Sequence, residues 1–416
     1  MKILWITNIL FPEVENIITH KGELCASGGW MLGAADALLK MGHGISLSVA
    51  SVSPLVKQLT VFQGKQITYY VLPYGRGNLT PNKEYEPIWK EVYRRFQPNI
   101  VHIHGTEYSH GLAFLEACPQ VKSVISIQGL RSVCSDYYHH GLTKFQIIRN
   151  LTIRDFLYGS IFEEKCNFKK SGENVEKPML RKVKHIIGRT SWDQAHAWAI
   201  NPKAKYHFNN ETLRPEFYDG SKWDYDKCCK YTIFLSQAGY PLKGLHQVLR
   251  AMPLILHYYP SAKVKVAGAD ITRNLTLRDK LSISSYGKII RSMIKQLHLE
   301  THIEFLGFLN VEQMKQAYLA CNVFVSPSSI ENSSNSLGEA QLLGVPHVAS
   351  FVGGISDMMV GNEENLYRFE DITMLSAKIC KIFADKDKQK DMSLVALKRH
   401  DRMNNAERLL EIYDQV

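Results

Sequence analysis

Several features that would place a chain in a membrane or secreted class are missing from these 416 residues. No segment approaches the roughly 20 consecutive apolar residues that a membrane-spanning helix needs. The amino-terminal MKILWITNIL carries one lysine and a short apolar run but no small-residue cleavage site. It therefore predicts a buried strand rather than a signal peptide, and we expect a cytoplasmic protein.

Metal and dinucleotide motifs are missing as well. The eight cysteines form no Cys-x-x-Cys pair and no zinc spacing, which favours reduced, mostly buried thiols. No Gly-x-Gly-x-x-Gly directly follows the first predicted strand and no acidic residue ends the second, which argues against a nicotinamide cofactor. No Asp-x-Asp cluster stands at a predicted strand end. We expect neither a bound metal nor a cofactor.

Positive charge is what the chain has in excess, with a net charge of +10. Part of it gathers in one basic cluster, at Lys165, Lys169, Lys170, Lys177, Arg181, Lys182 and Lys184. Such an excess favours anionic partners, either nucleotide diphosphates or an acidic membrane surface contacted peripherally. A solvated helical face is the commoner explanation of such a cluster. Nucleic acid is disfavoured, because no recognition motif accompanies the charge.

Strand-like and helix-like segments alternate in two series, which predicts an α/β protein with parallel sheets. Strands are expected at residues 3–6, 45–50, 67–72, 100–103, 123–127 and 185–188, then at 231–236, 263–267, 302–306, 323–326, 347–350 and 366–369. Helices are expected at residues 30–41, 88–96, 244–257, 311–320 and 373–384. Residues 209–229 are polar and turn-rich, so we place the linker between two domains there.

The most informative stretch is VFVSPSSIENSSNSLGEAQLLG, residues 323–344. It predicts a buried strand, a polar loop and a helix that begins near Asn335. The unpaired N–H groups of a helix N-terminus make a phosphate site. Glu331 in the loop and Glu339 in the helix would repel a phosphate, so they are better placed to accept hydrogen bonds from hydroxyl groups. Phosphate flanked by hydroxyls describes a sugar nucleotide.

The Glu-x7-Glu spacing after this strand, followed by GEAQLLGVPHVASFVGG, resembles the donor-site signature of family-four glycosyltransferases, which are retaining enzymes with the GT-B fold. The resemblance is strongest over residues 231–370. It implies two Rossmann-like, doubly wound domains facing across a cleft, with residues 1–210 binding the acceptor and residues 211–399 the nucleotide-sugar donor. A last helix, at about residues 400–416, would pack back on the first domain.

The resemblance also implies roles for single residues. Glu339 would bind the ribose hydroxyls and Glu331 the hydroxyls of the donor sugar. Lys243 and the backbone N–H groups near Ser336 and Leu337 would hold the diphosphate. The remaining expected donor-site residues are Ser236, Gln237, Asn335 and the glycine pair Gly28 and Gly29, whose loop would close over the phosphates.

Two positions depart from the family pattern. Gln237 lies in the region where the family carries an arginine, and Arg189 is a candidate to supply that cation from the first domain. Gln128 takes the place of a histidine beneath the reacting sugar, and an amide is not a general base. The departing phosphate would then take the acceptor's proton, with Lys243, Glu331 and Gln128 at the reaction centre.

His102 and His104 lie two residues apart on an expected strand and therefore share a face. No third ligand at a suggestive spacing accompanies them, so a metal site is disfavoured. His104, at the strand end, is expected on the acceptor side, and a buried core histidine is an equally good interpretation. For Arg189, capping or an ion pair at the domain hinge is at least as good an interpretation as contact with substrate.

The sequence thus predicts a metal-independent, retaining glycosyltransferase that moves a sugar from a nucleotide-diphosphate sugar to a hydroxyl of a glycan or lipid-linked glycan. A non-catalytic nucleotide-sugar-binding subunit and a sugar-nucleotide epimerase of the same fold are the alternatives. Peripheral contact with the inner membrane face is expected from charge and family alone. The sugar, the nucleotide base, the acceptor and the oligomeric state are left open.

Overall fold

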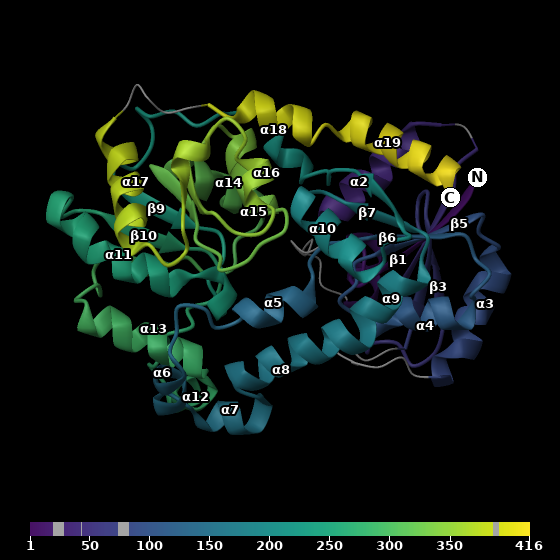
Figure 1. Cartoon of the computed structure of the whole chain (residues 1–416), viewed down its shortest axis with the longest axis horizontal. Coiled ribbons are helices and arrows are strands. Elements are labelled where there is room, and N and C mark those ends of the chain that lie inside the picture. Colours follow the sequence, from purple (N-terminus) through teal and green to yellow (C-terminus); the bar gives the residue numbers. More distant parts are fainter. Residues whose placement is uncertain (20–28, 43, 74–82, 386–390) are drawn as a thin grey trace. The chain divides into compact units, whose positions relative to one another are not determined.

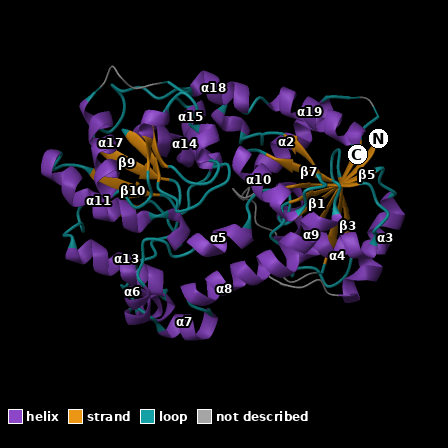
Figure 2. Ribbon diagram, in the orientation of Figure 1, coloured by secondary structure: helices purple, strands orange, loops and turns teal. Residues whose placement is uncertain are grey.

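The computed structural model describes residues 1–19, 29–42, 44–73, 83–385 and 391–416. The chain packs as two compact units, and each unit has its own sheet surrounded by helices (Figures 1 and 2). The first unit comprises residues 1–133, 167–215 and 399–416, and the second comprises residues 134–166 and 216–398. All strands and helices expected from the sequence are present within about two residues of their expected ends, so the α/β prediction is confirmed.

The sheet of the first unit has eight strands in the order β3-β4-β2-β1-β5-β6-β7-β8. β3 pairs antiparallel with β4, and the other neighbours are parallel. The strands are β1 (Lys2–Thr7), β2 (Ser46–Val52), β3 (Thr60–Gln63), β4 (Thr68–Leu72), β5 (Ile100–His104), β6 (Ser123–Ser126), β7 (His185–Gly188) and β8 (Lys205–Phe208). The edge strands β3 and β8 were not expected, because they are short and carry little apolar periodicity.

Alternation along β1 builds a core on each face of this sheet. Leu4 and Ile6 join one core, and Ile3 and Trp5 join the other. The helices that cover the two faces are α2 (Gly29–Lys40) and α19 (Arg402–Gln415) on one, and α3 (Glu86–Phe96), α4 (Ser109–Ala117) and α9 (Lys177–Lys182) on the other (Figure 1).

The last helix belongs to the first unit. Trp5 on β1 donates its indole N–H to the Tyr413 hydroxyl at 2.9 Å, and His102 Nδ1 lies 2.6 Å from the same oxygen. Both contacts are buried, so α19 is fixed to the sheet by hydrogen bonds as well as by apolar packing.

The sheet of the second unit has six parallel strands in the order β11-β10-β9-β12-β13-β14. The strands are β9 (Thr232–Leu235), β10 (Lys263–Val266), β11 (Ile303–Phe305), β12 (Val323–Ser326), β13 (His347–Ser350) and β14 (Leu366–Tyr367). β9, β12 and β13 are buried along their whole length, since a parallel sheet covered on both faces requires apolar strands. The expected helices here are α11 (Leu245–Tyr258), α14 (Val311–Ala320) and α17 (Ile372–Ala384).

Residues 134–166 pack with the second unit although they follow β6 of the first in the chain. The expected domain of residues 1–210 included this segment. Asp155 Oδ1 accepts a hydrogen bond from the Ser285 N–H at 3.2 Å, and His246 Nε2 lies 3.0 Å from the His140 carbonyl oxygen. These contacts join residues more than 100 positions apart, so no local pattern predicts them. Among the described residues, no helix has the length and apolar content needed to cross a bilayer.

Glu176 is a carboxyl buried inside the first unit. It ends the π-helical turn Gly172–Glu176 and accepts hydrogen bonds from the Arg131 N–H at 2.6 Å, the Ser132 N–H at 3.2 Å and the Ser132 hydroxyl. Gly172 is needed there, because a Cβ would overlap the Ser132 backbone. Burial raises the pKa of Glu176 to about 7, although these hydrogen bonds oppose the rise.

Glu176→Gln should remove part of the pH dependence of stability. Folded Glu176 binds its proton more tightly than it does in the unfolded chain, where the ordinary pKa is 4.5. Its contribution to the free energy of unfolding, on the order of 3 kcal/mol, is fully present below pH 4.5 and is lost as the pH rises through about 7. Urea denaturation at about pH 5 and about pH 8 measures the difference. Glu173→Gln, a half-exposed carboxylate on the same turn, is the control, and an unchanged pH dependence in Glu176→Gln would contradict the assignment.

Candidate functional site

Two loops meet at the carboxyl edge of the second sheet, where ligands of such sheets bind. The Ser329 N–H, in the loop after β12, donates to the Leu242 carbonyl oxygen, in the loop after β9, at 2.8 Å. Gly244 has a φ of +70°, and a Cβ at this position would overlap the Pro327 carbonyl oxygen. Glycine is therefore required for the two loops to approach this closely.

This approach brings together Lys243 and Glu331. The Lys243 Nζ lies 2.8 Å from Glu331 Oε2, and about a fifth of each side chain is exposed. The Ser328 hydroxyl donates to the same carboxylate oxygen at 3.2 Å. Burial opposes the charge of Lys243, but the Glu331 carboxylate more than offsets it, so the pKa of Lys243 lies above its ordinary value. The ammonium therefore stays charged at neutral pH.

Glu331 is also held by its backbone. Its carbonyl oxygen accepts a hydrogen bond from the Gly354 N–H at 3.0 Å. Gly353 has a φ of +52°, and a Cβ on it would overlap this same carbonyl oxygen. The glycine turn after β13 thus fixes the position of the Glu331 backbone.

The helix predicted after this loop, α15 (Asn335–Leu342), begins at Asn335. Ser334 caps it, and its hydroxyl accepts the Leu337 N–H at 3.3 Å. One backbone donor that we expected to hold a diphosphate is therefore occupied by the cap. The Asn335 Oδ1 is buried and has no hydrogen-bond partner in the described part of the chain. Glu339 lies one turn further on and is 5% exposed.

The remaining donor-site predictions are divided between the units. Ser236 and Gln237 follow β9 directly in the second unit, where Ser236 is half-buried and Gln237 is exposed. In the first unit, Gly29 begins α2. Gly28 lies outside the described residues.

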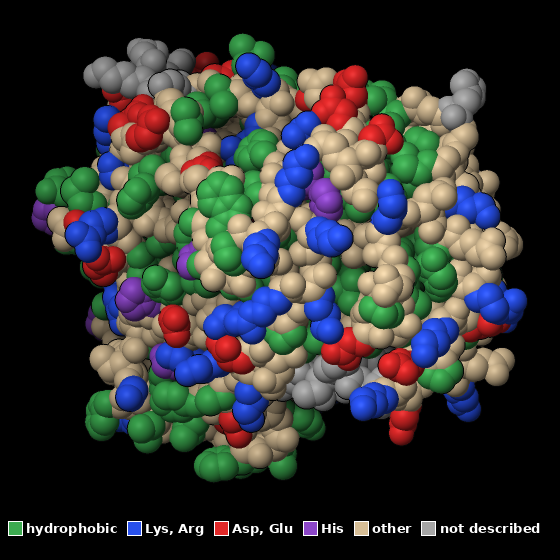
Figure 3. Space-filling model, turned by 45° about the vertical axis from the view of Figure 1, so that its right-hand side comes forward, with side chains coloured by type: hydrophobic (Ala, Val, Ile, Leu, Met, Phe, Trp, Pro, Cys, Tyr) green, Lys and Arg blue, Asp and Glu red, His purple; other side chains and the backbone are tan. Residues whose placement is uncertain are grey.

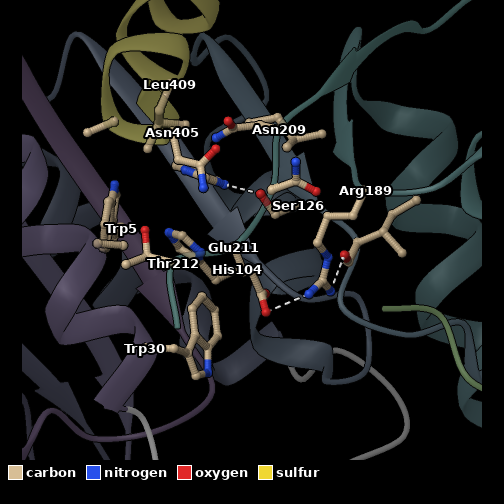
Figure 4. A pocket seen from close by; sticks show the side chains of 16 residues that line it. Trp5, Trp30, His104, Ser126, Arg189, Asn209, Glu211, Thr212, Asn405 and Leu409 are labelled. Carbon is tan, nitrogen blue, oxygen red and sulfur yellow. Dashed lines mark hydrogen bonds and ion pairs between the residues drawn. The ribbon is translucent and has the colours of Figure 1, made fainter. Parts of the chain in front are cut away.

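The first unit contains a pocket of its own at the carboxyl ends of β5, β6 and β7 (Figure 4). Its cavity volume is about 50 Å³. Trp5, Trp30 and His104 line it together with residues at the ends of β6 and β7, residues of the chain after β8 and residues of α19. Four lining side chains carry a buried polar atom without a hydrogen-bond partner among the described residues, namely His104 Nε2, Asn209 Oδ1, Asn210 Oδ1 and Asn405 Nδ2. Buried polar atoms are normally paired, so this pocket leaves several hydrogen-bonding groups available to water or to a polar ligand.

The two histidines of β5 share a face, as their spacing predicted, and their rings stack with centroids 3.8 Å apart. His102 lies between Tyr413 and Ser126, whose hydroxyl is 2.6 Å from His102 Nε2. His104 lines the pocket. Burial lowers the pKa of His104 to about 3, so its ring is neutral at physiological pH and acts through hydrogen bonds rather than charge.

Arg189, the candidate second cation, is 4% exposed. Its Nη1 lies 2.5 Å from a carboxylate oxygen of Glu211, and its Nη2 donates to the carbonyl oxygens of Ile127 and Gln128 at 2.9 and 3.0 Å (Figure 4). The Arg189 guanidinium is therefore enclosed by its own partners in the first unit, whereas about a fifth of the paired Lys243 side chain is exposed. These contacts fit the structural interpretation of Arg189, as a residue that caps a strand end and forms an ion pair. They do not support the prediction that Arg189 binds phosphate.

Glu107 is a residue to which we gave no role from the sequence. Gly105 has a φ of +91° and lies close to the side chains of Glu107 and Gln128. A Cβ at this position would overlap Glu107 Oε2 and lie 3.4 Å from Gln128 Oε1. The Glu107 Oε2 is buried, and no described residue hydrogen-bonds to it. Burial raises the pKa of this carboxyl, although Arg131 opposes the rise. A lone acid in a loop carries no sequence signal, so only the fold places it beside Gln128.

No group of three or more His, Cys, Asp or Glu side chains that could hold a metal ion occurs within the described ranges. The charged groups at the edge of the second sheet are thus arranged as an ion pair rather than as a ligand set.

Comparison with known proteins adds to this geometry. Residues 226–399, about two fifths of the chain, match the family model of glycosyl transferases group 1. A glycosyltransferase of Methanocaldococcus jannaschii is 32% identical over 130 residues, which are 31% of this chain and 29% of that protein. The phosphatidylinositol N-acetylglucosaminyltransferase gpi3 subunit of Schizosaccharomyces pombe is 21% identical over 419 residues, 99% of this chain and 80% of that protein.

The fold has a counterpart over the whole length of the chain. Sucrose-phosphate synthase from Thermosynechococcus elongatus, a GT-B glycosyltransferase, superposes with a TM-score of 0.71 at 15% identity and covers 100% of this chain and 98% of its own. The family match falls on the second unit, which carries Lys243, Glu331 and α15. Together these findings show that residues 226–399 are similar to the glycosyl transferases group 1 and that the whole chain has the GT-B fold.

Proposed function

We propose that this protein transfers a sugar, with retention of configuration and without a metal ion, from a nucleotide-diphosphate sugar to a hydroxyl group of a glycan or lipid-linked glycan. The observation that carries the proposal is the Lys243–Glu331 ion pair beside the N-terminus of α15. A cation, a helix N-terminus and a carboxylate within one sheet edge match the diphosphate and the hydroxyls of such a donor.

In this proposal the donor lies on the second unit. Lys243 and the backbone N–H groups at the start of α15 contact the diphosphate, and Asn335 contributes its unpaired amide oxygen to a hydroxyl group. Glu331 accepts hydrogen bonds from the donor sugar, and Glu339 accepts them from the ribose. Ser236 and Gln237 line the same edge.

The ion pair explains how the site favours the transition state. Negative charge grows on the diphosphate as the glycosidic bond breaks, and a cation already held in position stabilises that charge more than it stabilises the ground state. Glu331 holds the Lys243 ammonium in place before the donor binds, so little rearrangement is needed when the charge develops.

The acceptor is proposed to bind the first unit, in the pocket lined by His104. Its unpaired polar atoms and its two tryptophan rings suit a ring bearing hydroxyl groups. The name of the fission-yeast relative, which acts on phosphatidylinositol, supports a lipid-borne acceptor. Gln128 is proposed to hydrogen-bond a donor hydroxyl, while the departing phosphate takes the acceptor's proton.

Lys243→Ala should lower turnover by a factor on the order of 100, the cost of losing one donor to a developing anion. Lys243→Arg, which keeps the charge, should lose less. Lys227→Ala, an exposed lysine of the same unit, is the control. A thermal-shift screen of nucleotide sugars first identifies the donor. Nucleotide release then measures turnover. Full activity of Lys243→Ala would contradict the role proposed for Lys243.

The same assay separates the alternative functions. A non-catalytic binding subunit would be stabilised by the donor but would release no nucleotide. An epimerase would change the sugar without an acceptor. A transferase releases nucleotide in proportion to the acceptor supplied.

Transfer should persist in EDTA, because in this proposal Lys243 and a helix N-terminus, rather than a metal ion, compensate the charge of the diphosphate. Rates with EDTA and with added Mg²⁺ should agree within about twofold. Complete loss in EDTA, restored by Mg²⁺, would show that a metal ion is required.

Gln128→Ala should leave measurable transfer, since the amide is proposed to orient a hydroxyl and not to move a proton. The KM for the donor should rise more than kcat falls. Complete loss of transfer in a variant with an unchanged melting temperature would contradict this account of Gln128.

A further inference from the structure

The second unit carries an exposed apolar surface that the transfer reaction does not use. Of the 24 large hydrophobic residues exposed in the described chain, nine lie on α6 (Lys144–Arg149), α7 (Ile153–Tyr158) and α12 (Leu277–Ser282) or next to them. We call this set the apolar patch: Phe145, Ile148, Ile153, Phe156, Leu157, Tyr158, Leu275, Leu277 and Leu281. Hydrophobic side chains gather at the lower left of the space-filling view, with Lys, Arg, Asp and Glu side chains among and above them (Figure 3).

The patch is built on ordered, capped helices. Thr143, Thr152 and Thr276 each form a capping box at the start of α6, α7 and α12. Asp155 ties α7 to the Ser285 N–H, so the helices are anchored to the body of the unit. Short helices of six residues are not stable alone, and these caps hold them in place.

The apolar residues of the patch face away from the unit rather than into its core. Phe156 is 81% exposed and Tyr158 is 79% exposed. α12 has no buried residue, and its Leu277 and Leu281, four positions apart, share one outward side. An apolar surface of this extent marks an interaction site.

The charge around the patch is mainly positive, although Glu163, Glu164 and Asp270 stand next to it in the chain. Residues 141–162 and 271–288 contain seven Lys or Arg and two Asp. Both aspartates are used internally: Asp155 accepts hydrogen bonds from Thr152 and Ser285, and Asp279 caps α12 and pairs with Arg273 at 3.4 Å. The basic residues are Lys144, Arg149, Arg154, Arg273, Arg278, Lys280 and Lys288.

From these observations we propose that the apolar patch inserts into the interface of an anionic lipid bilayer while its basic rim contacts the headgroups. Apolar side chains in the acyl boundary together with cations at the headgroups are what an interfacial membrane site requires. A second copy of the chain fits less well, because a symmetric contact would set basic rim against basic rim. The proposal stands independently of the transfer reaction, but it would hold the enzyme where lipid-borne acceptors lie.

This surface differs from the basic cluster of residues 165–184 that the sequence suggested. Within that cluster Lys177 pairs with Glu173 at 2.5 Å, and Lys182 lies 4.0 Å from Glu116. No large hydrophobic residue between positions 159 and 197, all of which the structure describes, is exposed. Charge without apolar groups binds membranes weakly, so the membrane contact is assigned to the apolar patch instead.

The test is co-sedimentation of the full chain with vesicles of phosphatidylcholine alone or with about 30% phosphatidylglycerol. The protein should bind the anionic vesicles more tightly, and salt should weaken the binding. The double variant Phe156→Ser/Leu157→Ser should bind at least about tenfold more weakly. The control Phe308→Ser/Leu394→Ser changes a Phe and a Leu that are 88% and 77% exposed outside the patch, and it should bind as the unchanged protein does.

Leu277→Ser provides a second variant on a helix with no buried residue, should the double variant fail to fold. Failure of the unchanged protein to bind anionic vesicles would overturn the proposal. So would equal binding by the patch variants and the control. Sedimentation velocity adds a further outcome: conversion of a dimer to a monomer by the patch variants would assign the patch to a second copy of the chain. None of these results depends on transfer activity, so they leave the proposed function to its own test.

Discussion

The ion pair between Lys243 and Glu331 is the contact on which the proposed donor site depends. Its partners lie 88 positions apart, and they meet because Gly244 lets the loop after β9 approach the loop after β12. A half-buried cation is costly unless a carboxylate compensates it. Because Glu331 compensates it, the Lys243 ammonium stays charged at the sheet edge before any anion binds there. A diphosphate bound in the proposed site would need a cation at this position.

The two units differ in the kind of polar group they present. The second unit presents charge, in Lys243 and Glu331 and at the start of α15. The pocket of the first unit presents neutral groups, in His104 and three asparagine side chains. Arg189, which also lines it, is paired with Glu211. Charged groups suit a phosphate whose charge grows during reaction, whereas neutral groups suit hydroxyls that stay uncharged.

The fold also bears on where an anionic partner of this basic chain binds. From composition, the net charge of +10 indicated anionic partners without saying where they bind. In the fold, part of the cluster at residues 165–184 is paired with carboxylates, while α6, α7 and α12 of the apolar patch carry five Lys or Arg and two Asp. Association with a bilayer depends on apolar and basic groups standing side by side, and residues 141–162 and 271–288 become neighbours only through packing.

Local patterns in the sequence determined the α/β class, the strands and the helices, because burial in a parallel sheet demands apolar runs and helices demand periodicity. They also placed Glu331, Lys243 and the start of α15 at strand ends. Tertiary structure alone decided that Lys243 bonds Glu331, that Arg189 is paired with Glu211 and that Glu107 lies beside Gln128. Packing also decided that residues 134–166 join the second unit. Each of these facts is a contact between residues far apart in the chain, and such contacts leave no mark on composition, periodicity or spacing.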